Sequence, residues 1–442
     1  MLTVIAVLGI AATTIAPAAT ATPSGVLAPT ENVATRWVGR ALGAVRSGSP
    51  SQHTSTPGAA RTYAMTTSAM YDAVNGIDVA SGLSTRRSAI VESYAAAPPG
   101  ASREAATSAA AHSVLSSLFA TNPAVKSTLD SALEQELALL DSAPAVEAGR
   151  SWGASVGEMV LAARANDGTQ AATSRPGGTG AGAFPRTFSG TQFRTMSLFG
   201  ISAIEPYRSP GPPALTSDEY AAAVNEVKAL GSSTDRDPER AAIAKQWFAE
   251  GGTVRETGLW LKAALEIAAV KGTTASLSDT ARLFALLGMG IADAVTVSWN
   301  DKYDWMYWRP GDAIRQASID GNAKTTEDRT WSPRNGTCAS ANVTECAVFG
   351  GTPEHTSGTS TFAGAASTIL AGFYGTDAVR FSFAGEQPNA PARSYVGFSE
   401  AAREAGRSRI FGGIHFQFSN ELGREAGKGI GREITRTQLL PA

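Results

Sequence analysis

Apolar residues recur at helical spacing along most of this chain, and this pattern limits the folds open to it. Residues 31–47 place Val33, Trp37, Ala41 and Val45 on one helical face. Val and Thr alternation over strand lengths is almost absent. Further helices are expected over 60–76, 102–119, 123–140, 147–166, 217–230, 237–250, 256–271 and 279–300. The first of these is expected to stop at Gly76.

The chain is long enough to bury a sizeable core, with 442 residues of which 43% are hydrophobic and 17% charged. Residues 168–190 are rich in Gly, Ser and Thr and predict a long surface loop, and 206–216 form a proline-rich connector. These features predict an all-α fold, a large helical bundle with long active-site loops, as a single domain over residues 22–442.

The N-terminal segment has the features of an export signal. Residues 1–21 carry an apolar run too short to span a bilayer and end on Ala19-Thr20-Ala21, an A-x-A cleavage site. No Lys or Arg precedes Arg36, which favours a written start inside a longer leader. A disordered Ala/Thr tail is the alternative. Export predicts an extracellular protein, in which Cys338 and Cys346 would close a small disulfide loop rather than form a metal site.

Three separated segments carry cationic or anion-binding groups. In the first, residues 300–315, Lys302 and Arg309 are seven apart and are expected to share a helix face, with Cα atoms about 10 Å apart. Pro310 disfavours helical geometry at Arg309 and is expected to bend the chain, so that both side chains converge. Taken alone, this segment is better explained as an aromatic-rich helix end with a solvated Lys and Arg than as a ligand site.

The second segment, residues 351–362, is a glycine-bearing turn that opens a helix of small residues. Ser357, Gly358 and Thr359 begin that helix, and the amides and dipole of a helix N-terminus favour an oxyanion. The Ser357 hydroxyl can add another donor. An ordinary Ser-capped helix start is the alternative.

The third segment, residues 405–418, contains Arg409 and His415. A guanidinium offers a flat fork of donors to oxyanion oxygens. Gly412-Gly413 argues against one rigid helix between the two side chains. Since His415 is one of four histidines, a structural role is its more common reading when it is considered alone.

Together, the order Lys-x6-Arg-Pro, Ser-Gly, Ser-Arg-x5-His resembles the signature shared by vanadium-dependent haloperoxidases and the membrane-type and bacterial acid phosphatases. The resemblance to the bacterial haloperoxidase branch covers most of the chain after residue 21. It is carried by "AMYDAVNGI" (69–77), "RANDG" (164–168), "GPPALTSDEYAAAVNEVKALGS" (211–232) and "SRIFGGIHFQF" (408–418).

The resemblance implies a nearly all-helical fold and a vanadate site. Lys302, Arg309 and Arg409 would hold the equatorial oxygens, with Ser357 and the Gly358 amide as further donors. His415 would be the axial ligand to vanadium, or the phosphorylated nucleophile of a phosphatase. Phosphate could replace a lost vanadate, and neither a nucleotide nor haem is implied.

This sequence departs from the family at one position. The family has histidine directly after Ser-Gly, where it exchanges protons as peroxide binds, and here the residue is Thr359. A threonine hydroxyl cannot exchange protons near neutral pH as imidazole does. Loss of a general acid–base group typically costs about 10²–10⁴-fold in rate. His355, four residues earlier, is a weak candidate to replace it.

Three functions follow from this departure. We favour a rearrangement of an α-hydroxyketone by 1,2-acyl shift, because homologues in meroterpenoid pathways of the napyradiomycin type include such enzymes as well as chlorinating cyclases. The first alternative is a vanadium haloperoxidase that uses hydrogen peroxide and halide, and the second is a phosphatase or a non-catalytic oxyanion-binding protein. The expected partner is a small terpenoid or aromatic metabolite. Homodimerisation stays open, and a net charge of −2 gives no global field for nucleic acid.

Overall fold

The computed structural model describes residues 30–91, 97–335 and 351–441. The predicted export signal, residues 1–21, lies outside the described residues. The predicted disulfide between Cys338 and Cys346 lies outside them too. The predicted all-α fold is confirmed. The α-helices are α1 (Val33–Ser47), α2 (Thr56–Ala80), α3 (Arg103–Leu118), α4 (Pro123–Leu137), α5 (Ala143–Ala163), α6 (Asp218–Leu230), α7 (Pro238–Gln246), α8 (Arg255–Val270), α9 (Leu277–Trp305), α10 (Pro310–Arg315), α11 (Gly358–Tyr374), α12 (Phe398–Phe411) and α13 (Gln417–Thr437).

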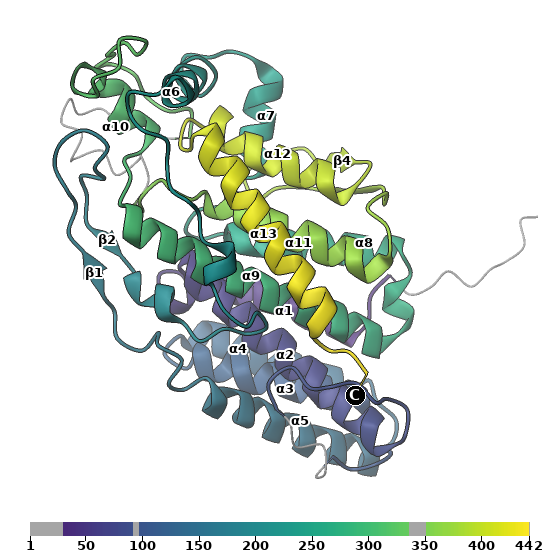
Figure 1. Cartoon of the computed structure of the whole chain (residues 1–442). Helices are drawn as coiled ribbons and strands as arrows, with labels where there is room; N and C mark the ends of the chain where they lie inside the picture. Colours follow the sequence, from purple (N-terminus) through teal and green to yellow (C-terminus); the bar gives the residue numbers. More distant parts are fainter. Residues whose placement is uncertain (1–29, 92–96, 336–350, 442) are drawn as a thin grey trace, which may run out of the picture.

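Two long helices, α2 and α9, pack against each other and join the two ends of the bundle. In Figure 1, α2, α3, α4 and α5 lie together at one end, α6, α7 and α10 lie at the other, and α13 crosses over α11 and α9. By length and composition α9 could span a membrane, but 94% of its most apolar window is buried inside the protein. Helix α9 is therefore a core helix of the bundle.

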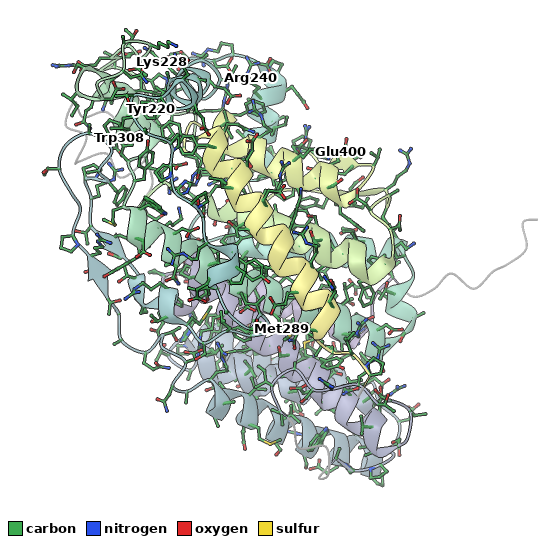
Figure 2. The ribbon with its side chains drawn as sticks, viewed as in Figure 1. Tyr220, Lys228, Arg240, Met289, Trp308 and Glu400 are labelled. Carbon is green, nitrogen blue, oxygen red and sulfur yellow. The ribbon has the colours of Figure 1, made fainter. Side chains whose placement is uncertain are left out.

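The buried apolar side chains form two clusters. The larger one joins α1–α5, α8, α9 and α11 and includes Met289. The smaller one gathers around Tyr220 and Trp308, whose rings stack with centroids 6.5 Å apart. Figure 2 shows these two side chains close together, far from Met289. Phe416 and Ile410 also belong to the smaller cluster, which therefore contacts both segments that flank His415.

Some helix boundaries differ from the prediction for identifiable reasons. The helix expected to stop at Gly76 continues to Ala80. A Cβ at Gly76 would lie 2.7 Å from Cζ2 of Trp152, so this glycine permits a close approach of α2 and α5 and does not end the helix. The loop predicted over 168–190 is present, but its ends pair as β1 (Ser174–Arg175) and β2 (Phe188–Ser189). A second antiparallel pair, β3 (Phe381–Phe383) and β4 (Arg393–Tyr395), precedes α12.

Candidate functional site

The first cationic segment is not the continuous helix that the spacing predicted. Helix α9 ends at Trp305, and Met306 takes the left-handed conformation with a φ of 42°. Arg309 is extended and stands just before α10, as the following Pro310 requires. The predicted shared helix face of Lys302 and Arg309 is therefore wrong, because the chain turns at Met306, before Pro310. Their side chains converge all the same.

Both cations line a cavity of about 340 Å³. The segments that meet there are the N-termini of α2, α8, α10 and α11, the last turns of α9, the end of β2, and the C-terminal end of α12 with the turn after it. The lining residues are Ser55, Thr56, Pro57, Ser189, Gly190, Arg255, Glu256, Trp299, Lys302, Arg309, Thr352, Gly358, Thr359, Phe362, Arg409 and His415. Six of the seven residues singled out in the sequence are thus brought together, from three segments that are more than 35 residues apart.

Arg309 and His415 are joined by direct hydrogen bonds. Arg309 Nη1 donates to His415 Nε2 at 2.9 Å and to the Ile414 carbonyl at 2.7 Å. Its other nitrogens donate to the carbonyl and the hydroxyl of Thr352 at 2.8 and 2.9 Å. All of these atoms are at least half-buried, so the guanidinium is held in one orientation.

Glu354 orients His415 from the opposite side of the ring. His415 Nδ1 donates to Glu354 Oε1 at 2.8 Å, and the same oxygen accepts the Phe416 amide at 2.9 Å. With Nδ1 carrying the hydrogen, Nε2 keeps its lone pair. Lys302 holds the backbone around Glu354 in place, because its Nζ donates to the carbonyls of Pro353 and Glu354 at 2.6 and 3.1 Å.

Burial and charge crowding shift the titration of this group. Burial, together with the charges of Arg309 and Lys302, holds the pKa of His415 well below its usual value. Burial and the Arg309 charge also hold the pKa of Lys302 well below its usual value. Burial raises the pKa of Glu354 to about 7, against the lowering effects of the Phe416 amide and the nearby cations. The imidazole is therefore neutral at pH 7.

The Ser-Gly-Thr turn begins α11 as the sequence predicts. Ser357 is the N-cap, and its hydroxyl oxygen accepts from the Ser360 amide at 3.4 Å and from the Ser360 hydroxyl at 2.8 Å. Ser357 is fully buried and does not line the cavity, whereas Gly358 and Thr359 do. The first amides of α11 have no acceptor within the helix, which leaves them available to an oxyanion.

His355 does not stand in for the missing imidazole. Its Nε2 lies 2.6 Å from the Ser209 hydroxyl, and its ring contacts the rings of Trp305 and Phe418. It is absent from the cavity lining, and burial lowers its pKa to about 3. The only imidazole that lines the cavity, among the residues with described positions, is therefore His415.

Arg409 reaches the cavity from α12 and faces a carboxylate. Its Nη1 donates to the Trp247 carbonyl at 3.2 Å, and its Nη2 lies 3.9 Å from Oε1 of Glu256. Glu256 Oε2 accepts from the Thr56 hydroxyl at 3.1 Å. The Nε of Arg409 is buried and has no hydrogen-bond partner in the described part of the chain. This wall is less tightly bonded than the wall around Arg309.

Sequence reasoning missed three groups at this site, Glu354, Glu256 and Thr352. Glu354 lies inside the second segment, but no spacing rule links it to His415, 61 residues later. Glu256 lies on α8, in a stretch that carries no motif. Its place in the first turn of a helix is common for an acidic residue, which conceals its position in the cavity.

The donor set fits a tetrahedral oxyanion such as vanadate or phosphate. Four cationic side chains, those of Arg255, Lys302, Arg309 and Arg409, two helix-start amides and one neutral imidazole surround the same cavity. No group of three His, Cys, Asp or Glu side chains that could hold a metal cation occurs in the described ranges. The unpaired, buried Nε of Arg409 is a further donor that an oxyanion could satisfy. A cofactor held here would thus be an anion.

Comparisons with known proteins bear on the fold and on the C-terminal part of the chain. Residues 282–439 match the family described as the VCPO second helical-bundle domain. The vanadium chloroperoxidase of Curvularia inaequalis is 28% identical over 185 residues, which cover 37% of this chain and 29% of that protein's length. The chain thus matches less than a third of this curated relative.

Two solved structures have the same fold. A bacterial vanadium-dependent iodoperoxidase superposes with a TM-score of 0.74 at 20% identity, over 93% of this chain and 97% of that one. A bacterial vanadium-dependent chloroperoxidase in its holo form gives 0.61 at 15% identity, over 86% and 91%. The chain therefore has the helical-bundle fold of vanadium haloperoxidases, and the family match over residues 282–439 supports a place among them.

Proposed function

We propose that this chain catalyses a redox-neutral rearrangement of an α-hydroxyketone by 1,2-acyl shift, with a terpenoid or aromatic metabolite as the substrate. One observation carries the proposal. Thr359 occupies the cavity where the resembling haloperoxidases place a proton-exchanging histidine, and His355 is bonded elsewhere. The pocket keeps its oxyanion donors but lacks the group that serves peroxide chemistry.

The rearrangement needs only groups that this cavity contains. A base takes the hydroxyl proton, and the electron pair of that O–H bond forms a new carbonyl. The bond from the carbinol carbon to the acyl group breaks, and the acyl group bonds to the adjacent carbonyl carbon. The old carbonyl oxygen becomes an alkoxide and takes a proton. No oxidant or reductant enters, so atoms and electrons balance within an isomerisation.

The cations around Arg309 are suited to stabilise the alkoxide. Donors that are already oriented in a buried site stabilise developing charge without reorganising. The bonds of Arg309 to Thr352 and Ile414 fix its guanidinium before a substrate arrives. Neutral His415 could act as the base, because burial and neighbouring cations lower its pKa, and Lys302, whose pKa is lowered by the same causes, is the alternative.

A second candidate is a vanadium-dependent haloperoxidase that uses hydrogen peroxide and halide. It is favoured by neutral His415, whose Nε2 accepts from Arg309 in a cavity that Lys302 and Arg409 also line. Vanadate, when bound, supplies the centre at which peroxide oxidises halide. Lys302, Arg309 and Arg409 would hold its oxygens, and Glu354 would keep His415 in the required tautomer.

One assay series separates the two candidates. The purified protein is analysed for vanadium and is then tested for halogenation of an acceptor dye with peroxide and halide, with and without added vanadate. The proposal predicts little halide oxidation and a weak response to vanadate. Robust bromination or chlorination that strictly requires vanadate would overturn it in favour of the peroxidase.

A further inference from the structure

Two polar groups in the cavity have hydrogen-bonding capacity that the protein does not use. Oε1 of Glu256 lies 3.9 Å from Arg409 Nη2, which is too long for a hydrogen bond. Arg409 Nε is buried without a partner in the described ranges, and the side chain is 7% exposed. An acceptor and donors are therefore left open side by side.

The other candidate bases are more fully engaged. His415 Nε2 already accepts a hydrogen bond from Arg309 at 2.9 Å. Lys302 holds two backbone carbonyls, so its position is committed to the turn before α11. Glu256 differs from both, because among the described residues only its Oε2 is bonded, to Thr56, while Oε1 is open to a ligand. It is also the one carboxylate among the cavity-lining residues that the structure describes.

The backbone holds Glu256 in place from a strained position. Arg255, the residue before it, has a φ of 61°, a left-handed conformation that strains a residue with a side chain. Two bonds maintain this geometry: Arg255 Nε donates to the Thr54 carbonyl at 2.6 Å, and the Arg255 amide donates to the Thr253 hydroxyl at 3.1 Å. Strain of this kind persists where the surroundings enforce it, and here it directs the start of α8 into the cavity.

We propose that Glu256 and Arg409 together bind a hydroxyl group of the substrate, with Glu256 Oε1 as the acceptor of its proton. Arg409 donates to the hydroxyl oxygen, and the O–H bond breaks as a new O–H bond forms on the carboxylate. The freed electron pair becomes the new carbonyl bond, and the proton then passes to the alkoxide formed beside Arg309. The identity of the hydroxyl rests on the proposed function; the ligand-facing position of Glu256 does not.

This assignment explains why an oxyanion pocket contains a carboxylate. A carboxylate near the ligand repels a fully charged oxyanion, whereas it attracts a neutral hydroxyl that can donate a hydrogen bond. The cavity is therefore selective for a neutral hydroxy-carbonyl compound over inorganic phosphate. If Glu256 served only to hold Arg409, its loss would loosen Arg409 and weaken the binding of any oxyanion.

The two roles predict opposite signs for phosphate binding. Binding of inorganic phosphate is measured by calorimetry on the full chain, for the wild type, Glu256→Gln and the control Glu266→Gln. The control removes the same charge from an exposed position of the same helix. A ligand-facing Glu256 predicts binding at least about tenfold tighter in Glu256→Gln and unchanged binding in the control. Weaker binding in Glu256→Gln would overturn the proposal.

Turnover tests the proton transfer itself. With an α-hydroxyketone substrate, Glu256→Gln should lower kcat by about 10²–10⁴-fold with little change in KM. Added acetate should restore part of the rate in Glu256→Ala, an effect that a merely structural residue would not show. A proportionate fall in kcat/KM through KM alone, without rescue, would contradict the assignment.

Two controls keep the outcomes separable. If the wild type rearranges no α-hydroxyketone, the proposed function fails, while the phosphate measurement still decides whether Glu256 faces the ligand. If Glu256→Gln does not fold, Glu256→Asp, which keeps the charge but withdraws it by one methylene, replaces it. Glu256→Asp should then bind phosphate more tightly than the wild type by a smaller factor, and weaker binding would again overturn the proposal.

Discussion

The cavity has two walls that use their arginines in different ways: a closed wall around Arg309 and His415, and an open wall around Arg409 and Glu256. Arg309 donates to Thr352, Ile414 and His415, all within 2.9 Å. Within the described ranges Arg409 makes one hydrogen bond, to the Trp247 carbonyl at 3.2 Å, and it faces Glu256 across 3.9 Å. In the closed wall the polar atoms are hydrogen-bonded to one another, whereas in the open wall they keep hydrogen-bonding capacity for a ligand. We infer that the first stabilises charge in a fixed place and that the second binds the group that reacts.

The largest effect is expected from breaking the closed wall. Arg309→Lys keeps the charge but loses the planar fork that reaches Thr352, Ile414 and His415 together. We expect kcat/KM to fall by about 10³-fold, comparable to the loss of one oriented donor to a developing oxyanion. Steady-state kinetics check this, with Arg208→Lys as the control, because Arg208 pairs with Asp301 and Asp304 outside the cavity. Equal losses in the two variants would remove the distinction between the walls.

The next effect concerns the carboxylate behind His415. Glu354→Gln should lower kcat by about 10–100-fold, because an amide can also present NH₂ to Nδ1 and no longer fixes the tautomer. Burial raises the pKa of Glu354 to about 7, so the carboxylate forms as pH rises through that value. The wild-type rate should therefore rise through about pH 7, and the variant should lack this step. A wild-type profile that is flat from pH 6 to 8 would contradict the role given to Glu354.

The same shift has a consequence for stability, with a definite sign. A folded-state pKa raised from 4.5 to about 7 contributes stability that is present below pH 4.5 and is lost as pH rises through about 7. The thermal midpoint of the wild type should thus fall, relative to that of Glu354→Gln, between these pH values. Parallel melting curves for the two proteins across this range would contradict the raised pKa.

A smaller effect is expected from a substitution at Thr359, in the turn that begins α11. Thr359→His returns an imidazole to a pocket whose oxyanion donors are in place. If the open wall has been rebuilt for a hydroxyl-bearing substrate, this variant should gain little vanadate-dependent halide oxidation, within about tenfold of the wild type. Dye halogenation with peroxide, halide and vanadate measures it. A gain of several hundredfold would show that the one missing imidazole separates this chain from a peroxidase.

The smallest effect is expected behind the closed wall. His355→Phe removes the bond to Ser209 but keeps an aromatic ring beside Trp305 and Phe418. We expect turnover within about threefold of the wild type and a loss of about 1–2 kcal/mol in the free energy of unfolding. Chemical denaturation and kinetics measure the two quantities. A loss of turnover as large as that of Glu354→Gln would give His355 a part in the reaction.

The sequence predicted the helices well because their apolar faces repeat with a helical period, as in α1 and α9. It failed where tertiary contact overrides a local signal, as at Gly76, which reads as a helix end but accommodates Trp152. The order of Lys302, Arg309, Ser357, Arg409 and His415 pointed to one pocket, since the motif is carried in short segments. Glu256 and Glu354 carry no such signal, because their roles depend on contacts across 153 and 61 residues, with Arg409 and His415.

The most direct test of the account is turnover of an α-hydroxyketone by the purified wild-type protein without peroxide, halide or vanadate. Product is followed by nuclear magnetic resonance and mass spectrometry. We predict a rearranged isomer of unchanged mass, formed at the same rate when vanadate is added. No isomer, together with halogenated product that appears only when peroxide, halide and vanadate are all present, would contradict the account.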